Sequence, residues 1–147
     1  MKLSEVMNSL IADEWIASVK YKMLAFSCKG KAKDAVDKKL FEIADEEYND
    51  HYTKLVTWSR NHGFKLITDP IELIRVANDK FPEFSDGLST KEAVDIVIKA
   101  EVGAINAYTK YIKAVNKLYP DLVAMFTELL SDEKKHKAEM TDLLSQV

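Results

Sequence analysis

Glycine, proline and cysteine are scarce in this chain. Its 147 residues include four glycines, three prolines and one cysteine. Long segments without glycine or proline favour helices and disfavour the many tight turns of a sandwich or barrel. The single cysteine, Cys28, cannot form an internal disulfide, which agrees with a reducing compartment. We expect one all-α domain over residues 1–147, large enough to bury a substantial core.

Blocks of like charge and long apolar runs are also missing. The 21 basic and 24 acidic residues are interspersed, the net charge is −3, and neither terminus carries a basic arm. We therefore expect no nucleic-acid partner. The first residues lead directly into an amphipathic segment with Glu5, Asp13 and Glu14, which is neither a secretory signal nor a membrane span. A cytoplasmic protein without a membrane partner is the expectation.

What the chain does contain is one acidic pattern in two copies. A glutamate is followed seven residues later by a tyrosine, and about 33 positions downstream by a second glutamate with a histidine just beyond it. A four-helix bundle holds two metal ions with such a set, in which one helix of each pair gives a Glu and its partner gives a Glu and a His. The first copy comprises Glu14, Tyr21, Glu47 and His51, and the second comprises Glu101, Tyr108, Glu133 and His136.

Both copies lie on apolar helix faces. Steps of three and four residues from Met7 to Cys28 pass through core residues and through Glu14, and the same steps from Leu122 to Leu143 pass through Glu133 and His136. An isolated ionised carboxylate in an apolar core is prohibitively costly, so these groups must be protonated, paired or bound to a cation. The alternative is solvated carboxylates with one core histidine, since 31% of the chain is charged.

The chain divides into four long helical segments. Short connections near Gly30 and Pro120 predict two antiparallel hairpins, and the long link of residues 63–88 must return the chain along the whole bundle. Within that link, Asp69 and Pro70 predict a capped short helix. The expected helices run from a Ser4 cap to Gly30, from Lys33 to just before Gly63, from a Ser89 capping box to about Leu118, and from Pro120 almost to Val147.

Five motifs along the chain share a pattern with a known family, and the similarity covers nearly the whole chain. They are Asp13-Glu14-Trp15, Ala44-Asp45-Glu46-Glu47 followed by His51, Asp69-Pro70, the run from Glu101 to Tyr108, and Asp132-Glu133-Lys134-Lys135-His136. Through these motifs the chain resembles the ferritin-like superfamily, and within it the Dps-like proteins that lie between bacterioferritin and Dps. The resemblance implies a ferroxidase site within each bundle, oxygen or hydrogen peroxide as oxidant, and assembly into a hollow shell.

By position, the resemblance implies metal ligands at Glu14, Glu47, Glu101, Glu133 and His136. The chain departs from the family where a Glu-x-x-His is expected, because Asp50 occupies the histidine position and His51 comes one residue late. The core face of this helix favours His51. A single inserted residue is commonly absorbed as a π-bulge, so we predict a π-turn around residues 46–51, with Asp50 as the alternative ligand.

Three further features complete the expectations. Tyr21 and Tyr108 are suited to hydrogen-bonding a ligand carboxylate or to supplying an electron, or are core tyrosines with satisfied hydroxyls. Gly103 stands where some Dps-like members carry a cysteine, so cysteine-dependent chemistry is not expected. A second apolar line on the first helix, from Ala12 and Trp15 to Phe26, requires a cover from the crossover or from another subunit.

We therefore expect a ferritin-like antiparallel four-helix bundle that binds two iron ions per chain, with manganese or zinc as alternatives at the same ligands. Its expected activity is oxidation of Fe(II) by oxygen or hydrogen peroxide, for iron storage or peroxide detoxification. The alternatives are a rubrerythrin-type peroxidase or oxidase with a separate electron donor, and a non-catalytic helical oligomerisation protein. The absence of a fifth helix after residue 143 favours a homo-oligomer of twelve subunits over twenty-four.

Overall fold

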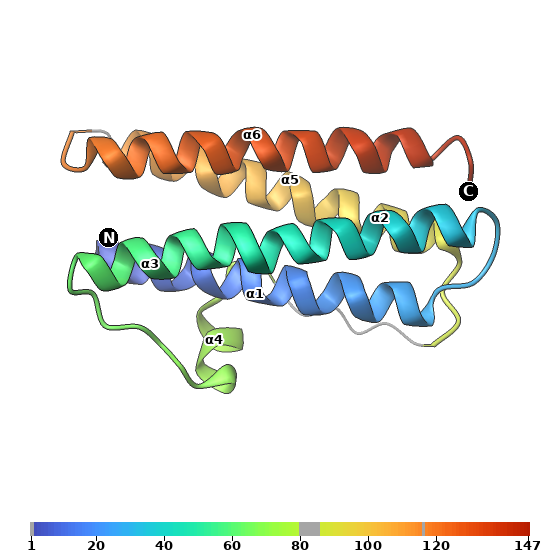
Figure 1. Ribbon diagram of the computed structural model, residues 1–147, viewed down its shortest axis with the longest axis horizontal. Helices are drawn as coiled ribbons and strands as arrows, with labels where there is room; N and C mark the ends of the chain where they lie inside the picture. The colour runs from blue at the N-terminus through green and yellow to red at the C-terminus, as the bar shows by residue number, and fades with distance from the viewer. Residues whose placement is uncertain (1, 80–85, 116) are drawn as a thin grey trace.

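The computed structural model describes residues 2–79, 86–115 and 117–147, which form an all-α antiparallel four-helix bundle (Figure 1). One hairpin pairs α1 with the rod made of α2, η1 and α3, and the other pairs α5 with α6. This confirms the predicted fold, including a short helix in the crossover. The elements are α1 (Leu3–Ser27), α2 (Lys33–Glu46), the π-helical η1 (Glu47–Tyr52), α3 (Thr53–Asn61), α4 (Pro70–Val76), α5 (Thr90–Val115) and α6 (Pro120–Leu143).

Local sequence signals set most of the helix ends. The predicted capping box closes the start of α5, where the Ser89 backbone N–H donates to Glu92 Oε2 at 2.8 Å and the Glu92 N–H donates to Ser89 Oγ at 3.0 Å. At α4, the Ile71 N–H donates to Asp69 Oδ1 at 2.9 Å, as the Asp69-Pro70 pair predicted. The part of the predicted crossover at residues 80–85 lies outside the described residues.

The first helix differs from the expectation at both ends. Lys2, rather than the predicted Ser4, occupies the cap position, and its side chain makes no capping bond. The helix ends at Ser27, short of Gly30, because the chain turns there to pair with the segment that precedes α5. In that pairing the Lys29 N–H donates to Leu88 O at 2.8 Å, and the Thr90 N–H donates to Lys29 O at 2.9 Å. Tertiary contacts therefore end this helix before its glycine does.

The apolar core falls into two clusters that lie toward opposite ends of the bundle. One cluster contains the first turns of α1, with α3 and the neighbouring halves of α5 and α6. The other contains the second half of α1, with α2 and the remaining halves of α5 and α6. The boundary between them lies at the level of Glu14, Glu47 and Glu133, so a buried polar layer separates the two clusters. Each cluster can therefore pack apolar side chains without the polar layer interrupting it.

The second apolar line of α1 is covered over only part of its length. The crossover packs beside Ala12 and Trp15, and Ala12 is fully buried. Further along, Phe26 is 80% exposed and contacts the ring of Phe41 edge-on at 5.5 Å. Among the described residues, the crossover covers the first half of the line, and Met23 and Phe26 beside the second half stay exposed. None of the described helices combines the length and the apolar character that crossing a membrane requires.

Candidate metal centre

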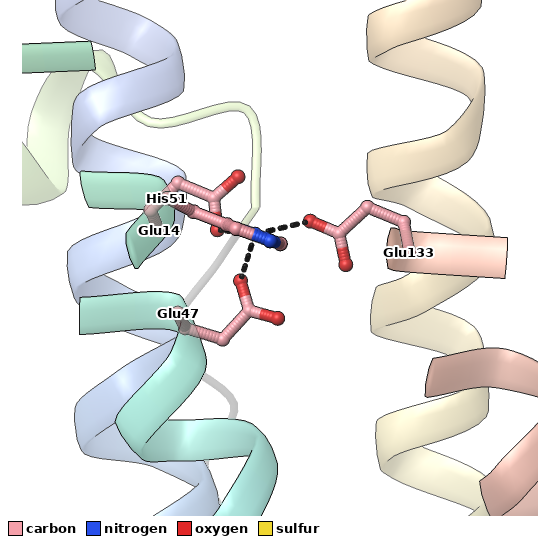
Figure 2. Close-up of side chains that lie close together, drawn as sticks. All are labelled: Glu14, Glu47, His51 and Glu133. Atoms are coloured by element: carbon pink, nitrogen blue, oxygen red, sulfur yellow. Dashed lines mark ion pairs between the residues drawn. The ribbon is translucent and has the colours of Figure 1, made fainter. Parts of the chain in front are cut away.

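All six side chains predicted as ligands meet at the middle of the bundle. They come from every long rod of the fold, and none is more than 3% exposed. Their potential ligand atoms form two groups, each with its atoms within 4.8 Å of one another. Figure 2 shows the first group, whose side chains point toward one another from α1, η1 and α6. The first group is Glu14, Glu47, His51 and Glu133, and the second is Glu47, Glu101, Glu133 and His136.

Glu47 and Glu133 belong to both groups, and each offers a different oxygen to each side. His51 Nδ1 lies 3.3 Å from Glu47 Oε2 and 3.3 Å from Glu133 Oε1. His136 Nδ1 lies 2.9 Å from Glu47 Oε1 and 3.3 Å from Glu133 Oε2. Carboxylates with one oxygen toward each group are placed to bridge two cations. Glu14 and Glu101 each belong to one group alone.

The π-turn explains how His51 reaches this position. The predicted turn is confirmed, since η1 spans Glu47–Tyr52 as a π-helix between two regular α-helices. The wide turn absorbs one extra residue, so Leu40 before it and Leu55 after it both stay fully buried. Asp50 lies outside the two buried groups: its side chain is 40% exposed and pairs with Lys54 at 3.0 Å. It approaches only the outer nitrogen of His51, with Asp50 Oδ2 at 3.9 Å from Nε2, beside Glu46 and Asp132. The structure thus brings His51, and not Asp50, into the two buried groups.

The outer nitrogen of each histidine faces a carboxylate that the sequence reasoning missed. His51 Nε2 lies 3.1 Å from Asp132 Oδ2, and His136 Nε2 lies 2.8 Å from Glu46 Oε2. A carboxylate on one ring nitrogen holds the proton there and frees the other nitrogen to bind a metal. The sequence held a signal for both, because an acidic residue directly precedes the second glutamate in each copy of the pattern.

The two tyrosines exchange partners across the bundle. Tyr21, on the helix of Glu14, donates its hydroxyl to Glu101 Oε1 at 2.8 Å. Tyr108, on the helix of Glu101, donates to Glu14 Oε1. Burial, with the nearby carboxylates, raises the pKa of both hydroxyls well above the usual value, so they stay protonated donors. The pair therefore fixes two ligand carboxylates and ties α1 to α5.

Burial sets the protonation of the four carboxyl groups. It raises the pKa of Glu101 and Glu133, and the neighbouring carboxylates add to the effect. Burial and the charge of Glu14 raise the pKa of Glu47 to about 8. Glu14 differs: burial alone would raise its pKa, but the neighbouring Glu47 and His51 overcome this and lower the pKa to about 2. Without a cation, like charges in this space are thus relieved by protons.

The histidines respond in the same sense. Burial by itself lowers the pKa of an imidazole, but the surrounding glutamates outweigh burial for His51 and His136, and they raise the pKa of His136 to about 12. The proton-bearing centre still has buried atoms without a hydrogen-bond partner, and a cation would satisfy them. Within the two buried groups these atoms are Glu47 Oε1, His51 Nδ1, Glu101 Oε2 and Glu133 Oε1.

Comparisons with known proteins agree with this geometry. The sequence model of the Ferritin-like domain family matches residues 4–147. A search of curated proteins found no match. The fold is similar to a dodecameric thioferritin, the bacterioferritin-related protein from Bacteroides fragilis, with a TM-score of 0.91 and 20% identity over 97% of this chain and 84% of that one.

Two Dps structures are similar as well. Dps from Staphylococcus aureus gives a TM-score of 0.88 at 17% identity, over 98% of this chain and 95% of that one. Dps from Listeria monocytogenes gives 0.89 at 13% identity, over 100% and 96%. These likenesses show the fold, and they match the resemblance to the Dps-like branch. Since the family match spans almost all of the sequence, the chain belongs to the ferritin-like domain family.

Proposed function

We propose that this protein is a ferroxidase that binds two Fe(II) ions within each chain and oxidises them with hydrogen peroxide or oxygen, for iron storage or peroxide detoxification. The observation that carries the proposal is the pair of buried groups that share Glu47 and Glu133. Two cations held by common carboxylates lie close enough to deliver one electron each to the same oxidant molecule. In this reaction iron is the substrate.

The donor set suits iron in both oxidation states. Carboxylate oxygens are hard ligands that bind one or both oxygens to a metal, and each imidazole nitrogen adds one firm bond to its ion. Four glutamates and two histidines leave positions free for an oxidant. With hydrogen peroxide, two Fe(II) ions each lose one electron, the O–O bond breaks, and two protons are taken up to give two waters. Manganese or zinc would fit the same ligands, so metal identity needs a direct measurement.

The carboxylates outside the centre complete the proposal. Glu46 and Asp132 hold the two imidazoles with Nδ1 toward the metals, and Tyr21 and Tyr108 hold Glu101 and Glu14. Such outer contacts orient the ligands before the metal arrives, which reduces the rearrangement that binding requires. The centre is therefore organised in advance for two cations.

We further propose a closed homo-oligomer of twelve subunits. A similar structure is a dodecameric thioferritin, and this chain leaves apolar surface open at Phe26 and at Met23. An exposed apolar surface on the outside of a bundle marks an association site. Light scattering should give the mass of twelve chains. A monomer mass, or that of twenty-four chains, would contradict this.

An anaerobic titration tests the activity. Metal-free protein should bind about two Fe(II) per chain, and added hydrogen peroxide should then oxidise both. Glu133→Gln removes the charge of a shared carboxylate and should lower binding at both positions. Less than half an iron per wild-type chain, or bound Fe(II) that neither oxidant consumes, would sink the proposal. Faster peroxide turnover with an organic reductant than with Fe(II) would favour the rubrerythrin-type alternative.

A further inference from the structure

A cavity of about 130 Å³ leads from the surface to the candidate centre between α1 and α5. Its inner end is formed by buried carboxylates, among them Glu14 and Glu101, together with Tyr21. Its outer end includes Lys99 and Gly103, which are exposed. A space lined at one end by ligand side chains and at the other by exposed residues is a route for a small molecule to the metals.

One wall of the cavity is built from residues with almost no side chain. Ala17 on α1 faces this space, as do Ala100, Gly103 and Ala104 on α5. A Cβ atom at Gly103 would meet nothing within 4 Å, and the backbone there is not in the left-handed region. Glycine inside a helix costs about 1 kcal/mol relative to alanine, and nothing in the turn requires it here. Its effect is to leave the α5 side of the cavity mouth open.

The opposite rim is fixed to α1. Asp13 accepts hydrogen bonds from the Asp79 backbone N–H at 2.8 Å and from Asn78 Nδ2 at 3.1 Å. The Asp79 side chain also forms an ion pair with Lys20, which is only 2% exposed. These contacts hold residues 78 and 79 of the crossover against the helix that carries Glu14. The cavity thus has a defined width, set by the α5 wall on one side and by this rim on the other.

The size and lining of the cavity indicate a class of oxidant. A water molecule needs only about 10–15 Å³ of such volume, whereas a cavity of about 150 Å³ can hold benzene. One part of this volume lies against Glu14, Glu47, Glu101 and Glu133, where iron would bind, and another part lies against Ala17, Ala100 and Ala104. We propose that the cavity admits a short-chain organic hydroperoxide, with its alkyl group against Ala17, Ala100 and Ala104 and its O–O group toward the metals. This inference rests on the proposed ferroxidase function and names a further oxidant for it.

The reaction balances with the groups already named. One hydroperoxide molecule, ROOH, takes one electron from each of two Fe(II) ions. The O–O bond breaks to leave an RO fragment and an OH fragment. The RO fragment takes one proton to give the alcohol ROH, and the OH fragment takes one proton to give water. Two Fe(III) ions and two consumed protons, supplied by solvent, complete the balance. One alcohol should therefore form for every two irons oxidised.

The test compares tert-butyl hydroperoxide with hydrogen peroxide on anaerobic protein loaded with about two Fe(II) per chain. Stopped-flow absorbance follows Fe(III), and proton NMR measures tert-butanol. Wild type should oxidise two irons per tert-butyl hydroperoxide. Gly103→Leu fills the mouth on a helix that tolerates the side chain, so it should lower the rate with tert-butyl hydroperoxide, relative to hydrogen peroxide, by about tenfold or more. Asn106→Leu, on an exposed position of the same helix, is the matched control and should leave that ratio unchanged.

Three outcomes would count against a proposal. Oxidation by hydrogen peroxide but not by tert-butyl hydroperoxide in wild type would overturn this inference and leave the ferroxidase proposal intact. An equal loss with both oxidants in Gly103→Leu would also overturn it, because the cavity would then not select by size. Bound iron that neither oxidant consumes would overturn the ferroxidase proposal itself, and this inference with it.

Discussion

The two halves of the candidate centre reach one arrangement through different backbones. In α6, Glu133 and His136 are three residues apart on a regular helix, whereas in η1, Glu47 and His51 are four residues apart on a π-helix. Both histidines nevertheless present Nδ1 to the same two shared carboxylates. The comparison teaches that the position of the donor atoms is held while the spacing in sequence varies, because a wide turn absorbs the difference.

The largest effect should come from deleting one residue in the regular half of the centre, and the matching deletion in the π-helical half should be milder. Removing the exposed Asn49 should convert η1 to a regular helix with a three-residue spacing, and the flanking helices should keep their buried faces. Removing the exposed Lys134 should rotate the rest of α6 by about 100° and turn Met140 away from the core. We expect the Lys134 deletion to cost roughly 3–5 kcal/mol and the Asn49 deletion much less. Thermal unfolding of both deletion variants, followed by circular dichroism, measures the two losses of stability. Equal losses would show that the π-turn is not a simple insertion of one residue.

The next effect separates the histidines from their neighbour. His51→Ala and His136→Ala should each lose about one iron per chain and slow oxidation by roughly ten- to a hundredfold. Asp50→Ala should do much less, since Asp50 pairs with Lys54 outside the buried groups. Iron titration of the three variants provides the measurement. A damaging Asp50→Ala together with an intact His51→Ala would make Asp50 the ligand.

The stability of the metal-free protein should depend on pH, because the pKa values of groups in both halves of the centre are shifted. The pKa of Glu47 is raised from 4.5 to about 8. Between these two pH values Glu47 is protonated in the folded chain and ionised in the unfolded chain, so its contribution to stability falls as pH rises from 4.5 to 8. His136, with its pKa raised from 6.5 to about 12, contributes stability that is complete below 6.5 and is lost as pH rises toward 12. Glu14, with its pKa lowered from 4.5 to about 2, acts in the opposite sense, but only below 4.5.

The metal-free protein should therefore melt lower as pH rises from about 5.5 to about 8. Zinc, a probe that does not change oxidation state, binds the deprotonated ligands, so its stabilising effect should grow over the same interval. Scanning calorimetry with and without Zn(II) across this range measures both curves. A melting difference that stayed constant or narrowed toward pH 8 would contradict the assignment of protons to the empty ligands.

The smallest effects sharpen the comparison between halves. Tyr21→Phe and Tyr108→Phe each remove the hydroxyl that donates a hydrogen bond to a buried carboxylate. Each change should lower the free energy of unfolding by about 1–3 kcal/mol. Because the two bonds cross between α1 and α5, the losses should be similar in size. Urea unfolding of the two metal-free variants tests this. A loss confined to one variant would show that the two halves are unequal in their outer contacts.

Sequence patterns determined more of the centre's composition than of its connections. Helical stripes identified the inward-facing candidate ligands, and the displaced histidine predicted the π-turn. The stripes could not show that Tyr21 bonds Glu101 rather than Glu14, because periodicity gives the face of a residue and not its partner across the bundle. The contacts of Glu46 and Asp132 were missed for the same reason. The cavity beside Gly103 depends on the crossover, whose path no local signal specifies.

The division of the centre between the hairpins has a consequence for the lifetime of the fold. The group around His51 takes Glu133 from α6, and the group around His136 takes Glu47 from η1. Neither hairpin alone holds a complete group, so a metal ion bound to either group would join the two hairpins as a cross-link. A link that forms only after the hairpins dock adds little to the rate of folding and must be broken before they separate. Bound metal should therefore act mainly by slowing unfolding, which protects the chain during long exposure to oxidant.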